Sequence, residues 1–138
     1  MNKSAHYQKD RKIMMEKLIN RLPLFMCMKI SSKDLLRVNK GFGGNLRSNS
    51  SLDFALDRVN NSKMGFYKKL AYLWRAILVD HPFSDGNKRT AVFLAYALAE
   101  ENKKYVDRDI LVYQAISIAQ KNLTSIRQIE WRLKNAIK

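Results

Sequence analysis

The sequence contains few of the residues that interrupt helices or cross-link chains. Its 138 residues include two prolines, five glycines and one cysteine. So few helix breakers favour helices over a fold with many turns. A single cysteine excludes an internal disulfide. Cys27 lies in the apolar run 24–28, where a side chain that fills the core is favoured over a nucleophile.

Long apolar runs are also missing. No stretch is long enough to span a bilayer. Residues 1–6 lead into a charged segment instead of the apolar core of a signal peptide. These two absences predict a cytoplasmic protein without a membrane partner. Hydrophobic residues nevertheless make up 46% of the chain, which suits a single folded domain spanning residues 1–138.

The chain is strongly basic, with 26 Lys and Arg against 12 Asp and Glu and a net charge of +14. Such a charge is compatible with nucleic acid, an acidic protein or another anionic partner. The positive residues, however, are spread along the chain and form no basic arm. A solvated, lysine-rich surface is therefore the favoured interpretation, with nucleic-acid binding as the alternative.

Hydrophobic residues recur at helical spacing in almost every segment. The pattern predicts helices over about 7–22, 31–38, 52–59, 66–81, 87–101, 110–118 and 126–137. The residues expected to start three of these helices are Ser31 or Ser32, Asp109 and Thr124. The expected apolar side of the helix after Asp109 consists of Ile110, Tyr113, Ile116 and Ile118. The helix from Asn87 is apolar nearly all round and belongs at the centre of an all-α bundle of about six to seven helices.

Residues 81–90 read His-Pro-Phe-Ser-Asp-Gly-Asn-Lys-Arg-Thr and join two of the predicted helices. Pro82 disfavours helical backbone at His81, so the first helix ends near there. The next helix begins at Asn87, and a helix N-terminus offers unpaired N–H groups and partial positive charge to a phosphate. Gly86 lets the backbone approach a ligand closely. The segment is therefore a candidate phosphate site.

The other side chains of this segment add complementary chemistry. Asn87 can orient a phosphate oxygen, while Lys88 and Arg89 add positive charge. Asp85 is a carboxylate of the kind that holds Mg²⁺ together with substrate phosphates. His81 can accept a hydroxyl proton near neutral pH. One short segment thus offers a base, a metal ligand and a phosphate cradle.

Each of these residues also has a simpler structural role open to it. His81 can cap the preceding helix, and Asp85 can stabilise the start of the next one. Lys88 and Arg89 can be solvated surface charges. For Phe83 the structural role, an anchor in the core, is the favoured one. It is the presence of all of them in this order that points to chemistry.

That order resembles the motif of the Fic/Doc (Fido) family, His-x-Phe-x-Asp/Glu-Gly/Ala-Asn-x-Arg, and every fixed position is filled. The helix before the motif, the apolar helix after it and the last two helices also resemble the Doc arrangement. The resemblance runs from about Asn45 to Lys138 and covers the N-terminal helices of residues 1–40 less well. It implies a Fic/Doc-like helical fold, with a short β-hairpin flap before the motif as an optional feature.

The resemblance also implies ATP and Mg²⁺ as cofactors and a protein hydroxyl as the acceptor. His81 would be the general base that deprotonates a Ser, Thr or Tyr hydroxyl, and Asp85 would hold the Mg²⁺. The anion hole would consist of Gly86, Asn87, Lys88 and Arg89. The flap that aligns the target peptide would consist of Gly44, Asn45, Leu46 and Arg47, within the glycine-rich and polar loop 41–51.

Two positions depart from the pattern of Fic adenylyltransferases. Those enzymes have a glycine after the motif asparagine and a second arginine three residues after the first, where this chain has Lys88 and Val92. Doc-type toxins resemble the chain here, and they transfer the terminal phosphate of ATP to a threonine of a translation factor. Pro82 and Gly86 match the common Fic form instead. Phosphorylation of a Ser or Thr hydroxyl is the favoured prediction, with AMP transfer as the alternative.

Many Fic proteins carry an inhibitory helix with the pattern Ser/Thr-x-x-x-Glu-Gly/Asn, but no glutamate here has Ser or Thr four residues before it. A toxin of this kind would need a separate antitoxin. A catalytically inactive module that binds nucleic acid or an acidic partner is the alternative from another class. The intact set of His81, Asp85, Asn87 and Arg89 favours the enzyme, because a binder has no need of all four.

Overall fold

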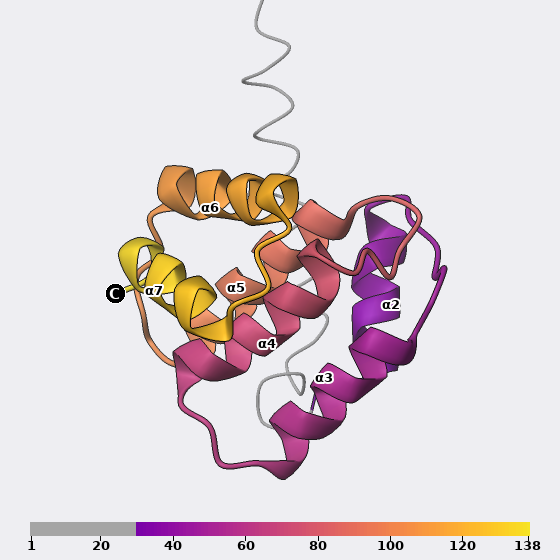
Figure 1. The fold of residues 1–138 in the computed structure, drawn as a ribbon, viewed down its shortest axis with the longest axis horizontal. Coiled ribbons are helices and arrows are strands. Elements are labelled where there is room, and N and C mark those ends of the chain that lie inside the picture. The colour runs from indigo at the N-terminus through magenta and orange to yellow at the C-terminus, as the bar shows by residue number, and fades with distance from the viewer. Residues whose placement is uncertain (1–29) are drawn as a thin grey trace, which may run out of the picture.

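The computed structural model describes residues 30–138, so Cys27 and the helix expected over 7–22 lie outside the described residues. The six helices of this range are α2 (Ser32–Gly41), α3 (Ser50–Asn61), α4 (Phe66–Leu78), α5 (Asn87–Glu101), α6 (Arg108–Lys121) and α7 (Ile126–Ala136) (Figure 1). Strand pairing within residues 30–138 is limited to two isolated bridges. The predicted all-α bundle is confirmed. None of the helices in this range is long and apolar enough to cross a membrane.

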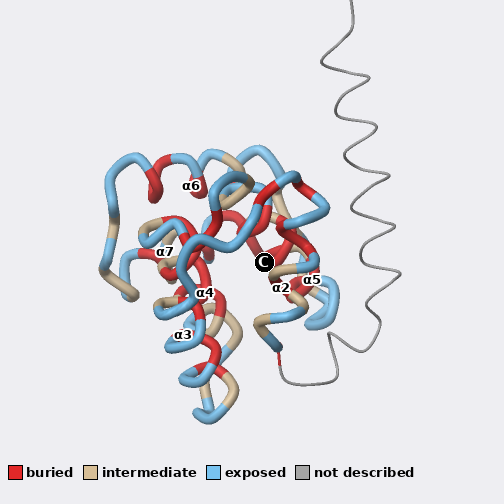
Figure 2. The backbone as a smooth tube through the Cα atoms, turned by 90° about the vertical axis from the view of Figure 1, so that its right-hand side faces the viewer, coloured by how far each residue is buried: buried red, intermediate tan, exposed pale blue. Residues whose placement is uncertain are grey.

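Helices α4 and α5 form the centre of the bundle. Helix α4 packs against α3, α5 and α7, while α5 also contacts α2 and α6. Buried positions concentrate on these two helices (Figure 2). Trp74 of α4 is fully buried, and its indole N–H donates to the Ala91 carbonyl of α5 at 2.9 Å. Each fully buried Leu or Ile of this core contributes about 1.5–3 kcal/mol to folding.

Two of the expected helix ends are confirmed, and two are wrong. Ser31 caps α2 in a capping box with Asp34, and α5 ends at Glu101, the last residue of the predicted range 87–101. Helix α6, however, is capped by Asp107, whose carboxylate accepts the Ile110 N–H, while Asp109 lies within the first turn. Helix α7 is capped by Ser125 instead of Thr124. In both cases a neighbouring residue with the same capping chemistry reaches the amide of the first turn.

The expected apolar side of α6 is also wrong for three of its four residues. Ile110, Tyr113 and Ile116 are exposed, Tyr113 by 64%, and only Ile118 is buried. Two stripes at helical spacing run along this helix, and the buried stripe contains two polar residues, Gln114 and Ser117. Their burial is compensated because the Arg132 guanidinium of α7 donates to both side-chain oxygens at 2.9 Å. On α7, Ile129 and Leu133 are buried and Ile126 is only partly so, and Ile137, which follows the helix, is buried as well.

Candidate phosphate and acceptor site

The turn after α4 places His81 at the surface. Helix α4 closes with a bond from the Val79 N–H to the Arg75 carbonyl, so His81 is not the residue that caps it. His81 has a φ of 49°, in the left-handed region that side chains other than glycine rarely adopt. Pro82 disfavours right-handed helical backbone at the preceding residue, in agreement with the end of α4 before His81, and the left-handed conformation adds local strain. The turn holds an exposed imidazole at the start of the motif.

Phe83 and Asn87 fix the shape of the loop that follows. Phe83 is fully buried, as an anchor requires. Its N–H donates to Asn87 Oδ1 at 3.2 Å, and its carbonyl accepts from Asn87 Nδ2 at 2.9 Å. The Asn87 amide therefore clamps the loop onto the first turn of α5. One of the two Nδ2 hydrogens remains for a ligand. The Asn87 side chain can therefore donate a single hydrogen bond to a phosphate.

Asp85 and Gly86 lead directly into α5. The Gly86 N–H donates to Asp85 Oδ1 at 2.7 Å, and Oδ2 has no bond to any described residue. Gly86 has a φ of 75° and, as the residue that precedes the helix, provides no capping side chain. No side chain therefore caps the N–H groups of Asn87 and Lys88 in the first turn of α5. Lys88 and Arg89 are exposed beside them.

The predicted flap pairs with the motif itself. Leu46 and Phe83 form an antiparallel bridge, in which the Arg47 N–H donates to the Pro82 carbonyl at 2.7 Å and the Ser84 N–H to the Asn45 carbonyl at 2.8 Å. No β-hairpin is present among the described residues. The N–H and C=O of Leu46 point to the opposite edge of this short strand and bond to no described group. The Leu46 side chain is 41% exposed.

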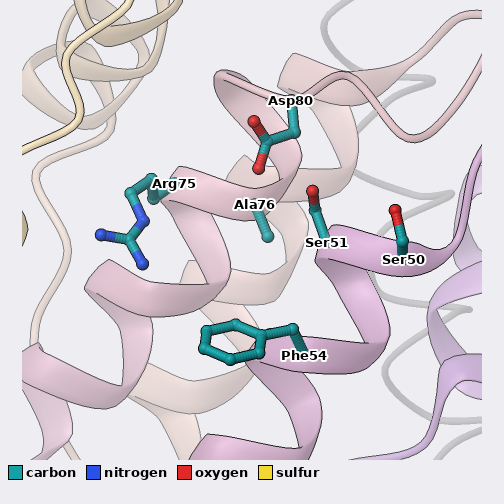
Figure 3. A pocket seen from close by; sticks show the side chains of 6 residues that line it. All are labelled: Ser50, Ser51, Phe54, Arg75, Ala76 and Asp80. Carbon is teal, nitrogen blue, oxygen red and sulfur yellow. The ribbon is translucent and has the colours of Figure 1, made fainter.

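A pocket of about 260 Å³ opens between α3 and α4. It is lined by Ser50, Ser51 and Phe54 of α3, Arg75 and Ala76 of α4, and Asp80 of the following turn (Figure 3). The Phe54 ring is 60% exposed, and the Arg75 guanidinium lies over the Tyr72 ring at 5.2 Å. The sequence prediction does not include this pocket. A large aromatic side chain on the polar side of a predicted helix, as at Phe54, is the one signal that indicates it.

Asn39 is a further residue of the site that the motif does not contain. It lies near the end of α2, is 1% exposed, and donates from Nδ2 to the Asp85 carbonyl at 2.8 Å and to Thr90 Oγ1 at 3.2 Å. Figure 1 shows the loop between α4 and α5 passing beside α2. The sequence signal for Asn39 is a polar residue directly after Val38 and one helical turn after Leu35, on the buried side of an amphipathic helix.

The donor set fits a magnesium ion that a nucleotide brings with it. The described residues contain no cluster of three or more His, Cys, Asp or Glu side chains able to hold a metal alone. Asp85 does present an exposed carboxylate with one oxygen unused, next to the α5 N-terminus. Mg²⁺ is usually held by one or two carboxylates plus phosphate oxygens and water. One protein carboxylate beside a phosphate cradle meets that requirement.

The all-α bundle and the exposed histidine turn before an uncapped helix N-terminus agree with the Fido-like arrangement that the motif predicts. A family model described as the Fic/DOC family matches residues 29–99, and the chain belongs to this family. The match begins before Asn45, where the expected resemblance starts, and does not include α6 or α7. Curated proteins and solved structures give no match. Fic/DOC proteins are generally nucleotidyl transferases or related enzymes that act on proteins, use ATP with Mg²⁺ and often pair with antitoxins.

Proposed function

We propose that the protein is an ATP-dependent enzyme that modifies a hydroxyl group of a target protein in the cytoplasm. The observation that carries the proposal is that one continuous segment, from His81 to Arg89, contains all the groups the reaction needs. An exposed base, a carboxylate with an unused oxygen and an uncapped helix N-terminus follow one another within nine residues. This is the set of groups that phosphoryl or nucleotidyl transfer requires, namely proton removal, metal binding and charge neutralisation.

The nucleotide phosphates would lie at the start of α5. The N–H groups of Asn87 and Lys88 point toward them, and the helix dipole adds partial positive charge. The Lys88 side chain and the Arg89 guanidinium supply two full charges from the exposed side of the same turn. The unused Asp85 oxygen would hold Mg²⁺, which when bound neutralises charge on the phosphates. Asn87 acts mainly through the loop, because its amide is occupied by Phe83.

The acceptor would approach from the side of the flap. The unpaired N–H and C=O of Leu46 form an edge onto which an extended peptide can add as a strand. The flap strand lies between that edge and the loop that begins at His81, so an acceptor side chain of the peptide would have to reach past the flap to bring its hydroxyl to the imidazole. The pocket between α3 and α4 lies next to Asp80 and would receive a neighbouring side chain of the target.

Transfer of the terminal phosphate is the favoured reaction. The target oxygen would form a bond to the γ-phosphorus while the bond to the β–γ bridging oxygen breaks, releasing ADP, and the hydroxyl proton would pass to an imidazole nitrogen of His81. Lys88 supplies a flexible cation where the Fic pattern has glycine, and Val92 packs partly against the core, so no second arginine lines the site one turn further on. These two differences favour Doc-like phosphorylation of a Ser or Thr. AMP transfer, which would release pyrophosphate, is the alternative.

Labelled ATP distinguishes these reactions. The purified protein is incubated with Mg²⁺, a cell extract as the source of targets, and ATP labelled at the α or the γ phosphate. The His81→Ala variant serves as the control. Label on a protein band only from γ-labelled ATP, and only with the parent protein, supports phosphorylation. Label only from the α position refutes it in favour of AMP transfer, and no Mg²⁺-dependent ATP binding at all refutes the enzyme.

A second candidate function, from another class, is that of a basic module that binds nucleic acid or an acidic protein. The net charge of +14 favours it. Binding of a DNA duplex that weakens steeply between about 50 and 200 mM salt, with no ATP binding, would favour this candidate. The sequence lacks the family's inhibitory glutamate pattern, so we also expect a separate antitoxin to restrain the enzyme. Such an antitoxin would abolish label transfer when it is added to the assay above.

A further inference from the structure

Asn39 is the one residue within 30–138 that has a buried side-chain polar atom without a hydrogen-bond partner. This atom is Oδ1. Its amide nitrogen, in contrast, donates to two acceptors, the Asp85 carbonyl and Thr90 Oγ1. The amide cannot be turned over, because Oδ1 would then face the Asp85 carbonyl and two acceptors would repel each other. The donor orientation is therefore fixed by the loop, and the unpaired acceptor follows from it.

The two acceptors of Asn39 lie in sequence on either side of the residues that begin α5. Asp85 carries the carboxylate that would bind Mg²⁺, and Thr90 lies in the first turn of α5. A single side chain from α2 thus ties Asp85, two residues before the helix, to the helix itself. The nitrogen holds the backbone of Asp85 and makes no contact with the carboxylate oxygens. Asn39 therefore acts on the metal ligand by fixing where its backbone lies.

Asn39 also holds the beginning of the flap. Its main-chain carbonyl accepts from the N–H groups of Phe42 and Gly44 at 2.9 and 3.2 Å. A Cβ atom on Gly44 would overlap Asn39 Oδ1 and the Asp85 carbonyl, and one on Gly86 would come within 3.1 Å of Asn39 Nδ2. The side chain is therefore enclosed by one glycine from the flap and one from the motif loop. The side chain holds the motif loop, and the main-chain carbonyl of the same residue holds the start of the flap.

The position of Asn39 selects a side-chain donor aimed at the motif loop. An apolar residue of similar volume would remove the unpaired Oδ1 but would also leave the Asp85 carbonyl and Thr90 Oγ1 without the N–H group that both accept from. We infer that Asn39 is a positioning residue for the transfer reaction, which aligns the Asp85 carboxylate with the α5 N-terminus and sets the flap against both. This inference rests on the proposed function and adds to it a residue outside the sequence motif. It also makes α2 part of the active-site framework.

The test compares Mg²⁺-dependent ATP binding of the parent protein with that of two variants, Asn39→Leu and Asn39→Asp. Both keep the approximate size of the side chain, and both lose the donor to Asp85. Loss of a partner that orients a metal ligand typically weakens metal affinity about 10- to 100-fold. We expect the Mg²⁺ concentration for half-maximal ATP binding to rise by about that factor in both variants. ATP binding without Mg²⁺ and the helical circular dichroism should stay close to those of the parent.

Thr90→Val is the matched control. It removes the second acceptor and keeps the bond from Asn39 to Asp85, so the Mg²⁺ requirement should change less than about threefold. An unchanged Mg²⁺ requirement in a folded Asn39→Leu protein would overturn the inference while leaving the proposed function intact. Loss of helical structure in both Asn39 variants would overturn it as well, since the residue would then serve stability. If the parent itself binds no ATP in the presence of Mg²⁺, the proposed function fails first.

Discussion

Replacement of Gly44 by alanine is expected to disturb the site more than the protein as a whole. The added methyl group would overlap Asn39 Oδ1 and the Asp85 carbonyl. The second of these atoms belongs to the backbone and cannot rotate away, so the motif loop has to shift. Inserting a methyl group into a packed interior usually costs about 1–3 kcal/mol. For a chain of this size that corresponds to a fall in Tm of about 3–12 °C.

Two other glycines provide matched controls. A Cβ at Gly65, which precedes α4, meets no atom within 4 Å and the backbone there is ordinary, so Gly65→Ala should change stability by less than about 0.5 kcal/mol. A Cβ at Gly43 also meets open space, but its φ of 83° makes alanine unfavourable by about 1–2 kcal/mol. Gly43→Ala therefore reports backbone strain without a clash. Only Gly44→Ala combines destabilisation with displacement of Asp85.

The assays are thermal denaturation and titration with Mg²⁺ and ATP. We expect Gly44→Ala to lower Tm and to weaken Mg²⁺-dependent ATP binding by about tenfold or more, equivalent to about 1.4 kcal/mol. Gly43→Ala should lower Tm with little change in binding, and Gly65→Ala should leave both unchanged. A Gly44→Ala protein as stable as Gly65→Ala, with the nucleotide affinity of the parent, would refute the packing of flap and motif loop around Asn39.

Three further outcomes can be measured. His81→Ala should slow label transfer by about 10²- to 10⁴-fold and leave Mg²⁺-dependent ATP binding unchanged, and a comparable loss of binding would contradict its role as a base. Asn87→Ala removes both bonds to Phe83 and should cost about 1–3 kcal/mol in urea denaturation, with faster amide exchange at Phe83. Unchanged exchange there would argue against the clamp. Arg132→Met leaves two buried oxygens of α6 unpaired and should cost about 1–3 kcal/mol, whereas a neutral effect would mean that water replaces the guanidinium.

The chemistry of the motif could be predicted from the sequence because it is local. His81, Asp85, Gly86 and Arg89 lie within nine residues, and a proline, a glycine and the start of an apolar helix determine the backbone between them. The burial of Phe83 follows from the same pattern. Contacts of this kind are set by neighbours along the chain, and those are visible in the sequence.

The partners of the motif could not be predicted because they are distant in sequence. Asn39 and Asp85 are separated by 46 positions, and helical periodicity marks Asn39 only as a polar residue on a buried side. The bridge from Leu46 to Phe83 likewise depends on how α2 and α5 pack. On α6, two stripes have equal spacing, and the choice between them depends on Arg132 of another helix. Tertiary packing decides between alternatives that the local pattern leaves equal.

The free edge at Leu46 has a consequence for how targets could be exchanged. Main-chain pairing is insensitive to side-chain identity, so an extended segment of almost any sequence can satisfy those two backbone groups. Discrimination between substrates would then reside in the neighbouring pocket, where Phe54 and Arg75 present their side chains. Under the proposed function, substitutions at these two positions would change which targets are modified. The flap and the motif loop are hydrogen-bonded to each other, so a transfer of the site to another protein would have to move both together.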